Sequence, residues 1–170
     1  VLGALGYTHC SIEEVGVLRS IPNITIVSPA DALEVVKALI ASLNYKESVY
    51  IRLTGGAPIK PLYKEDYKFE IGKAIKLQNG NDVAIFSSGA SVYHSLEASR
   101  ILKEKGISCS VVNFHTIKPI DQQMIFNEIK KKKLIITVEE HNIIGGLGSA
   151  VSEVISKLPN TPKTVTMGIE

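Results

Sequence analysis

A strand, a glycine turn and a helix are expected in direct succession around the run VEEHNIIGGLGSAV, residues 138–151. The apolar residues 134–138 include several β-branched side chains, which indicates a buried strand. Three glycines follow within the run and indicate a tight turn. Residues 149–158 then carry apolar side chains at helical spacing. The run therefore marks a crossover unit of an α/β fold.

The same alternation of strand and helix recurs along the chain. Strands are expected at residues 24–27, 49–53, 74–77, 83–87, 108–114 and 164–167. Helices are expected after residue 14, from about 29 to 43, from 92 to 105 and from 121 to 131. Strands that alternate with helices of this length favour right-handed parallel crossovers. We therefore predict an α/β fold with a mostly parallel sheet in a three-layer α/β/α sandwich.

Local signals predict how some of these elements begin and connect. Ser11 and Glu14 have the spacing of a capping box at the start of the first helix. Ser28 is expected to cap the next helix, with Pro29 at its first position. The turn sequence QNGND, residues 78–82, is expected to join the strands on either side of it as an antiparallel hairpin.

Composition narrows the class of protein. The chain has 170 residues, of which 45% are hydrophobic, enough for a buried core. Its formal net charge of +2 gives no electrostatic argument for binding nucleic acid or an anionic membrane. No apolar run reaches the roughly 18 residues of a transmembrane helix. Cys10 and Cys109 lie far apart, which fits reduced thiols in a cytoplasmic protein. We therefore expect a cytoplasmic globular protein with neither nucleic acid nor membrane as a partner.

Two motifs together resemble a known family. The segment GYTHCSIEEVGVLRSIPNITIVSPAD, residues 6–31, and the run VEEHNIIGGLGSAV resemble the carboxyl-terminal half of transketolase and its thiamine diphosphate-dependent relatives. The resemblance spans nearly the whole chain and is strongest to the separate C-terminal subunit of split transketolases. It implies that residues 1–57 are the carboxyl-terminal part of a pyrimidine-binding domain, 58–70 a linker, and 71–170 a transketolase C-terminal domain.

The resemblance implies two site residues. Gly6-Tyr7-Thr8-His9 matches the Gly-x-Thr-His loop near the substrate, so His9 is the candidate catalytic and substrate-binding residue. An imidazole can donate to a sugar hydroxyl, accept from it or exchange a proton near neutral pH. Arg52 matches an arginine that binds substrate phosphate, and its planar guanidinium suits phosphate oxygens. Leu5 stands where many transketolases have an aspartate that recognises the donor sugar, so the donor is expected to differ.

Other polar residues are expected to have structural roles. Arg19 is expected to form a salt bridge or a helix-end contact. His115 and His141, the latter beside Glu139, are expected to be structural or interface residues rather than metal ligands. The run GGLGSAV lacks the Walker lysine and the full dinucleotide fingerprint, so close helix packing is expected there. Neither a metal ligand nor a cofactor-binding residue is therefore predicted in this chain.

The resemblance implies part of a transketolase that transfers a two-carbon ketol group between sugar phosphates. The complete enzyme would use thiamine diphosphate and Mg, whose binding residues are expected largely outside this chain. Because Val1 leads directly into a glycine-rich loop, we expect the sequence to begin inside a larger domain. The resemblance implies that the diphosphate and magnesium domain and the start of the pyrimidine-binding domain lie outside it, so we expect this chain to be inactive alone. The expected partners are an amino-terminal transketolase subunit or the missing domains, sugar phosphates, and further copies in a homo-oligomer.

Three alternatives remain open. Two are enzymes, a deoxyxylulose phosphate synthase and the beta subunit of a 2-oxo acid dehydrogenase. The third is a noncatalytic assembly or regulatory module of the same fold. Restored activity with an amino-terminal partner would favour an enzyme subunit, whereas binding without turnover would favour the module.

Overall fold

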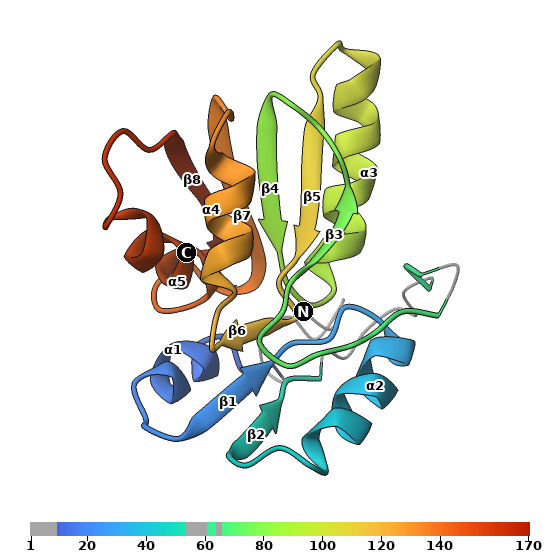
Figure 1. Cartoon of the computed structure of the whole chain (residues 1–170), viewed down its shortest axis with the longest axis vertical. Helices are drawn as coiled ribbons and strands as arrows, with labels where there is room; N and C mark the ends of the chain where they lie inside the picture. The colour runs from blue at the N-terminus through green and yellow to red at the C-terminus, as the bar shows by residue number, and fades with distance from the viewer. Residues whose placement is uncertain (1–9, 54–60, 64–65) are drawn as a thin grey trace.

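The computed structural model describes residues 10–53, 61–63 and 66–170, which form five helices and eight strands (Figure 1). The helices are α1 (Glu14–Arg19), α2 (Ala32–Ser42), α3 (Ser91–Glu104), α4 (Gln122–Ile129) and α5 (Leu147–Ile155). The strands are β1 (Ile24–Val27), β2 (Ser48–Ile51), β3 (Ile75–Gln78), β4 (Val83–Ser87), β5 (Cys109–Asn113), β6 (Thr116–Lys118), β7 (Leu134–Asn142) and β8 (Lys163–Ile169). Across these described ranges, none of the helices combines the length and the apolar character needed to span a bilayer.

The larger sheet has five strands in the order β3-β5-β4-β7-β8. Strands β5, β4, β7 and β8 run parallel to one another, and β3 pairs with β5 in the antiparallel direction at one edge. This arrangement confirms the prediction of an α/β fold with a mostly parallel sheet.

The predicted hairpin within this sheet is wrong. Strand β3 pairs with β5, and β4 lies on the far side of β5. The connection from β3 to β4 therefore crosses the beginning of β5. Gly80 permits this crossing, because a Cβ at that position would lie 2.1 Å from the carbonyl carbon of Cys109. The QNGND sequence thus marks a close passage over another strand rather than a two-strand turn.

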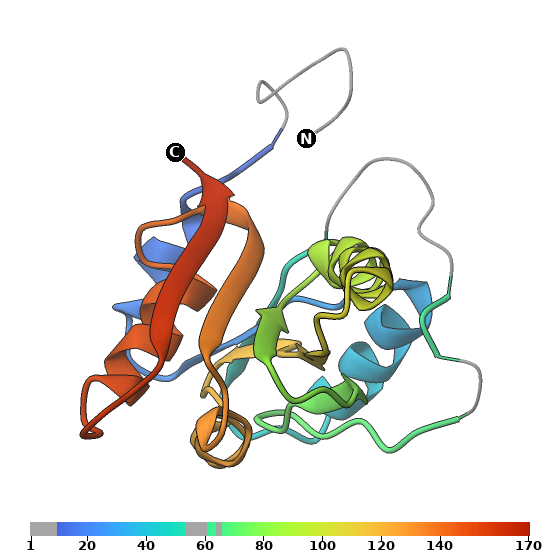
Figure 2. The same cartoon turned by 90° about the horizontal axis from the view of Figure 1, so that it is seen from above.

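Helices cover both faces of the larger sheet (Figure 2). Ala84 and Phe86 of β4 belong to a core cluster that includes side chains of α4 and α5. Val83 and Ile85 of the same strand pack on the opposite face, where Leu96 of α3 joins their cluster. Successive residues of a strand point to opposite faces, so β4 contributes to both helical layers. The three-layer prediction is confirmed.

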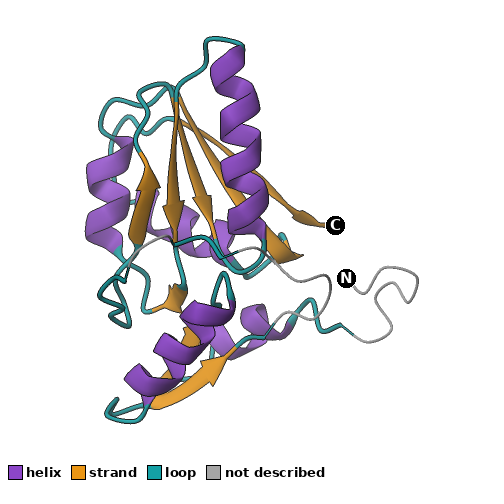
Figure 3. Ribbon diagram, turned by 90° about the vertical axis from the view of Figure 1, so that its right-hand side faces the viewer, coloured by secondary structure: helices purple, strands orange, loops and turns teal. Residues whose placement is uncertain are grey.

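A smaller sheet joins the two halves of the chain. Its order is β2-β1-β6, with β1 and β2 parallel and β6 antiparallel to β1. Strand β6 comes from the carboxyl-terminal half, and no sequence pattern predicted it. Val15, Ile26, Ile117 and Ala150 form a core cluster beside this sheet. Figure 3 shows that the smaller sheet, with α1 and α2, lies against the end of the larger sheet at which β4 and β5 terminate.

Two helix starts differ from the sequence predictions. The cap of α2 is Asp31, whose carboxylate accepts from the Glu34 N–H at 2.8 Å, so the prediction of Ser28 as the cap is wrong. Helix α1 begins at Glu14 without a side-chain cap, so the predicted capping box with Ser11 is also wrong. The reason in α1 is a competing partner, because the Glu14 carboxylate pairs with Arg52 instead.

Candidate functional site

Arg52 lies at the junction between the two sheets. It directly follows β2, and its backbone N–H donates to the carbonyl of Val27 at the end of β1 at 2.8 Å. Its side chain reaches the Glu140 carbonyl in β7 of the larger sheet. Ligand crevices in α/β folds lie outside the carboxyl ends of parallel strands. Arg52 therefore occupies a position that suits a ligand contact.

Three groups hold the Arg52 guanidinium. Its Nε donates to Oε1 of Glu14 at 2.5 Å. Its Nη2 donates to the carbonyl of Ser11 at 3.2 Å and to that of Glu140 at 2.8 Å. Nη1 has no hydrogen-bond partner within the described ranges of the chain. Among the described residues, Arg52 is thus held through Nε and Nη2, and Nη1 is the nitrogen that an additional acceptor can use.

Glu14 is the charged partner of Arg52. The two side chains are 15% and 11% exposed, so solvent screens their ion pair only weakly. Burial by itself raises the pKa of Glu14, but the hydrogen bond and the positive charge of Arg52, together with smaller effects of the Ser11 side chain and the Glu14 backbone, lower the pKa overall. Oε2 of Glu14 is buried and has no hydrogen-bond partner among the residues that the structure describes. The pair therefore rests on one carboxylate oxygen.

Arg19 fastens α1 to the second half of the chain. Its Nη1 donates to the carbonyl of Gly145 at 2.8 Å, and its Nη2 forms an ion pair with Glu153 of α5 at 2.6 Å. Close backbone packing accompanies these bonds, since a Cβ at Gly145 would lie 2.7 Å from the Cα of Gly16. Both terminal nitrogens of Arg19 thus have structural partners, as the sequence predicted.

Glu139 belongs to β7, and its carboxylate lies at the glycine turn before α5. Its carboxylate accepts from the N–H of Leu147 at 2.6 Å and from that of Gly148 at 2.8 Å. A Cβ at Gly146 would lie 1.9 Å from Oε2 of Glu139, so the glycine allows the carboxylate to approach. Burial raises the pKa of Glu139, and the two backbone N–H groups offset part of that effect. An internal carboxylate therefore takes the anion position that a helix start offers.

His115 and His141 are held by neighbours within the fold. Nδ1 of His141 lies 2.7 Å from the carbonyl of Asn142, so that nitrogen carries the proton, and Nε2 accepts from the Gly16 N–H at 3.4 Å. His115 is fully buried and stacks on Phe69 with 4.2 Å between ring centroids. Burial lowers the pKa of His115 to about 4, so its ring is neutral near pH 7.

A buried carboxyl that sequence reasoning missed joins three segments of the chain. Glu34 of α2 accepts from Nδ2 of Asn113 in β5 at 3.0 Å to each oxygen. It also accepts from the hydroxyls of Tyr63 at 3.0 Å and Tyr67 at 3.2 Å, and from the N–H of Ala30 at 2.7 Å. Both tyrosines belong to the segment around the predicted linker. Glu34 thus ties that segment to both halves of the chain.

The environment of Glu34 perturbs its ionisation. Burial raises the pKa of Glu34, and the hydrogen bonds from Asn113, Ala30 and the two tyrosines only partly counteract burial. The sequence did hold one signal of this site. Glu34 stands four residues before Ala38, on the buried face of α2, where helical spacing calls for apolar side chains.

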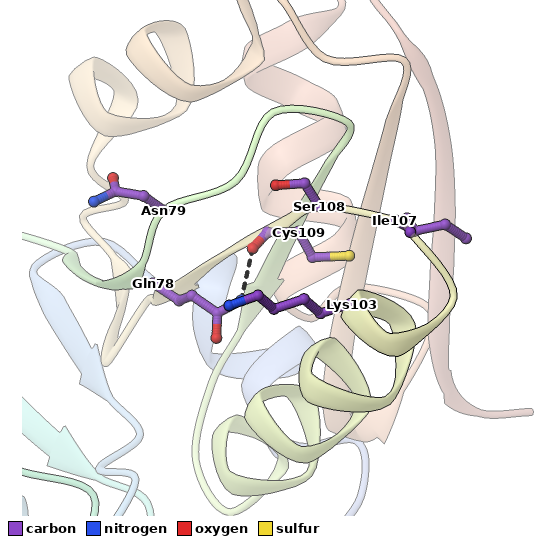
Figure 4. Close-up of a pocket in the computed structure, with 7 residues that line it drawn as sticks. Gln78, Asn79, Lys103, Ile107, Ser108 and Cys109 are labelled. Atoms are coloured by element: carbon purple, nitrogen blue, oxygen red, sulfur yellow. Dashed lines mark hydrogen bonds between the residues drawn. The ribbon is translucent and has the colours of Figure 1, made fainter.

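A cavity of about 460 Å³ lies at the other end of the larger sheet (Figure 4). Its lining includes Gln78, Lys103, Ser108 and Cys109. Nε2 of Gln78 donates to the carbonyl of Cys109, the first residue of β5, at 2.8 Å. The cavity therefore opens at the amino ends of the parallel strands, whereas Arg52 lies at their carboxyl ends. The two features do not form one site.

His9, the first candidate catalytic residue, and Leu5 lie outside the described residues. Ser11, two positions after His9 in the sequence, is described, and its carbonyl accepts from Nη2 of Arg52. Within the described ranges, no group of three or more His, Cys, Asp or Glu side chains is placed to hold a metal ion.

Two family models match the chain. The model described as transketolase, pyrimidine binding domain, matches residues 1–57, and the model described as transketolase, C-terminal domain, matches residues 72–168. The chain is 41% identical over 158 residues to an apulose-4-phosphate transketolase subunit of Phocaeicola vulgatus, across 92% of this chain and 50% of that protein. It is 38% identical over 158 residues to 1-deoxy-D-xylulose-5-phosphate synthase of Halothermothrix orenii, across 92% of this chain and 25% of that protein.

A solved structure is similar over almost the same length. It is described as a split gene transketolase, inactive beta4 tetramer, and superposes with a TM-score of 0.90 at 34% sequence identity. The match covers 97% of this chain and 55% of that one. The chain also spans about half the length of the first curated relatives that it matches.

Proposed function

The chain belongs to the transketolase family, and we propose that it forms the carboxyl-terminal part of a split transketolase. The observation that carries this proposal is its similarity to a separate transketolase subunit across 92% of the chain. The complete enzyme transfers a two-carbon ketol group from a ketose phosphate to an aldose phosphate. We retain the predicted division into residues 1–57, 58–70 and 71–170 as part of this proposal.

The complete enzyme would use thiamine diphosphate and Mg. Two observations bear on where the diphosphate and the metal ion would bind. They include no cluster of three potential metal-ligating His, Cys, Asp or Glu side chains. The helix start at the glycine turn is filled by the carboxylate of Glu139. We therefore assign the diphosphate and metal sites to an amino-terminal partner subunit.

His9 and Arg52 would act on the substrate. His9 would orient substrate hydroxyls or exchange protons with them. Arg52 would hold a substrate phosphate through Nη1, since its other bonded nitrogens face Glu14, Ser11 and Glu140. Leu5 cannot hydrogen-bond a sugar hydroxyl, so the donor would differ from that of transketolases with aspartate at this position.

Association with other chains is part of the proposal. Large apolar side chains are exposed along α2 and just beyond its end: Leu33, Val36, Leu39, Ile40 and Leu43. Exposed apolar side chains that share one helix face by their spacing are typical of interaction sites. This surface supports association with an amino-terminal subunit. We also propose that the complete enzyme forms a homo-oligomer in the cytoplasm.

Reconstitution tests the function directly. The complete natural protein that contains this chain is mixed with its amino-terminal partner, thiamine diphosphate and Mg, and ketol transfer is measured with a panel of ketose and aldose phosphates. We expect turnover from the mixture and none from the chain of 170 residues alone. A stable complex without turnover would favour the noncatalytic module, and turnover by the isolated chain would contradict the proposed division of the site.

A second candidate function has its own support. The similarity to 1-deoxy-D-xylulose-5-phosphate synthase covers 92% of this chain, so that reaction class belongs in the same assay. Turnover with a 2-oxo acid donor and none with ketose phosphates would favour this candidate, or the 2-oxo acid dehydrogenase relative, over transketolase.

A further inference from the structure

Two arginines cross the junction between the halves of the chain, and their bonding differs. Arg19 uses both terminal nitrogens, Nη1 for the carbonyl of Gly145 and Nη2 for Glu153. Arg52 uses Nε and Nη2, while Nη1 has no partner within the described part of the chain. Both terminal nitrogens of Arg19 therefore have partners within the fold, whereas the two N–H groups of Arg52 Nη1 have no acceptor among the residues that the structure describes.

The partners of Arg52 determine which nitrogen of its guanidinium has no hydrogen-bond partner among the described residues. A carboxylate often pairs with a guanidinium through two parallel hydrogen bonds. Glu14 does not do so, because only Oε1 bonds Arg52 and Oε2 has no partner among the described residues. The carbonyls of Ser11 and Glu140 both accept hydrogen bonds from Nη2. Nη1 thus takes no part in these contacts, and the guanidinium plane is fixed by Glu14 and by β7.

We propose that Glu14 is a positioning residue that aims Nη1 of Arg52 at the substrate phosphate, together with the Glu140 carbonyl of the carboxyl-terminal half. The inference rests on the proposed function and deepens it. It makes the carboxyl-terminal half part of the phosphate site, beyond a role in assembly. Glu14 touches no substrate itself and acts only through Arg52.

The charge of Glu14 is the property that matters. Its carboxylate compensates the guanidinium in a place where the two side chains are 15% and 11% exposed. Glutamine has the same length and keeps one acceptor oxygen, but it lacks the charge. Glu14→Gln therefore weakens the contact with Arg52 without removing volume. Glu14→Ala removes that contact entirely and leaves Arg52 with the carbonyls of Ser11 and Glu140 alone.

The test compares donors with and without phosphate in the reconstituted enzyme. For Glu14→Gln we expect the KM for a ketose phosphate donor to rise about tenfold, which corresponds to about 1.4 kcal/mol. The KM for a donor without phosphate and the kcat for either donor should stay within about twofold of wild type. Glu14→Ala should raise the first KM further.

Glu153→Gln is the matched control. It removes the charged partner of Arg19 across the same junction and leaves the contacts of Arg52 intact. Its kinetic constants should equal those of wild type. An equal rise of KM for both donors in Glu14→Gln, or the same change in Glu153→Gln, would show general loosening of the junction and overturn the inference. An unchanged KM in Glu14→Gln would overturn it as well.

A spectroscopic measurement separates this inference from the proposed function. The Nε–H signal of Arg52 in the complete protein, assigned with Arg52→Lys, is followed by nitrogen-15 NMR. We expect a shifted signal in Glu14→Gln and the wild-type signal in Glu153→Gln. Wild-type enzyme without turnover would overturn the proposed function, whereas an Nε–H signal unaffected by Glu14→Gln would overturn the positioning role whatever the activity.

Discussion

Replacing Glu34 by alanine is expected to lower the free energy of unfolding by about 3 kcal/mol. Glu34 is 0% exposed, and its carboxylate accepts from the Ala30 N–H at 2.7 Å and from Nδ2 of Asn113 at 3.0 Å. Ala30 and Asn113 are themselves buried, at 1% and 0% exposed. Alanine would therefore leave two buried donor groups without this acceptor.

The magnitude follows from these donors and one opposing effect. Each buried N–H left unsatisfied costs roughly 1 to 3 kcal/mol. The Ala30 N–H loses its acceptor, and Nδ2 of Asn113 loses the acceptor of one hydrogen while it keeps the Tyr63 hydroxyl at 2.9 Å for the other. The two lost hydrogen bonds together therefore cost roughly 2 to 6 kcal/mol. The hydroxyls of Tyr63 and Tyr67 belong to half-buried residues and can turn to water, so they add little. The loss of the carboxyl also removes the free-energy cost of burying a charged group, the same effect that raises the pKa of Glu34. That relief places the expected loss near the lower half of the range.

Urea unfolding followed by circular dichroism at pH 7 measures this loss, since the chain has no tryptophan to report by fluorescence. Glu97→Ala is the matched control, because Glu97 lies on α3 with its side chain 50% exposed and pairs weakly with Arg100 at 3.7 Å. The control should change the free energy by less than about 0.5 kcal/mol. A loss below about 1 kcal/mol in Glu34→Ala would refute the reasoning, because it would mean that water satisfies both donors.

Three further predictions concern stability. The raised pKa of Glu34 means that the folded protein binds the Glu34 proton more tightly than the unfolded chain does. The stability of wild type relative to Glu34→Gln should therefore fall as the pH rises above 4.5. A difference in urea midpoints that does not change with pH would contradict this prediction. Glu139→Ala should cost about 2 kcal/mol by removing the acceptor for two N–H groups of the α5 start, and phosphate should raise the Tm of that variant but not of wild type. Gly80→Ala should lower stability by about 3 kcal/mol or prevent folding, because its Cβ would lie 2.1 Å from the Cys109 carbonyl carbon; a wild-type Tm would show that the crossing can shift.

Periodicity and composition were sufficient to predict most elements of this fold. The helix expected at residues 92–105 is α3 (Ser91–Glu104), and the strand expected at residues 83–87 is β4 (Val83–Ser87). The spacing of the apolar side chains within a segment predicts both its secondary structure and its buried face, and this information lies within the segment itself. The alternation of elements then restricts the architecture to a layered α/β fold.

The pairing of β3 and the existence of β6 were not predictable in the same way. Strand β3 pairs with β5 and not with β4, the next strand in the sequence. The three-residue strand β6 pairs with β1 from the other half of the chain. A short strand carries too few side chains for a periodic signal. Which strand it joins depends on the surfaces that remain after the other elements have packed.

For the candidate site, the sequence alone singled out His9 and Arg52 through motif resemblance and a charge suited to phosphate. It also indicated the family, because the resemblance extends over nearly the whole chain. Only the tertiary structure showed that Arg52 contacts Glu140, 88 positions away, and that Glu34 contacts Asn113, 79 positions away. Such contacts depend on where folding brings distant side chains, and no local pattern encodes a partner at that separation. The residue types were therefore readable from the chain, whereas the partners that orient them were decided by packing between its two halves.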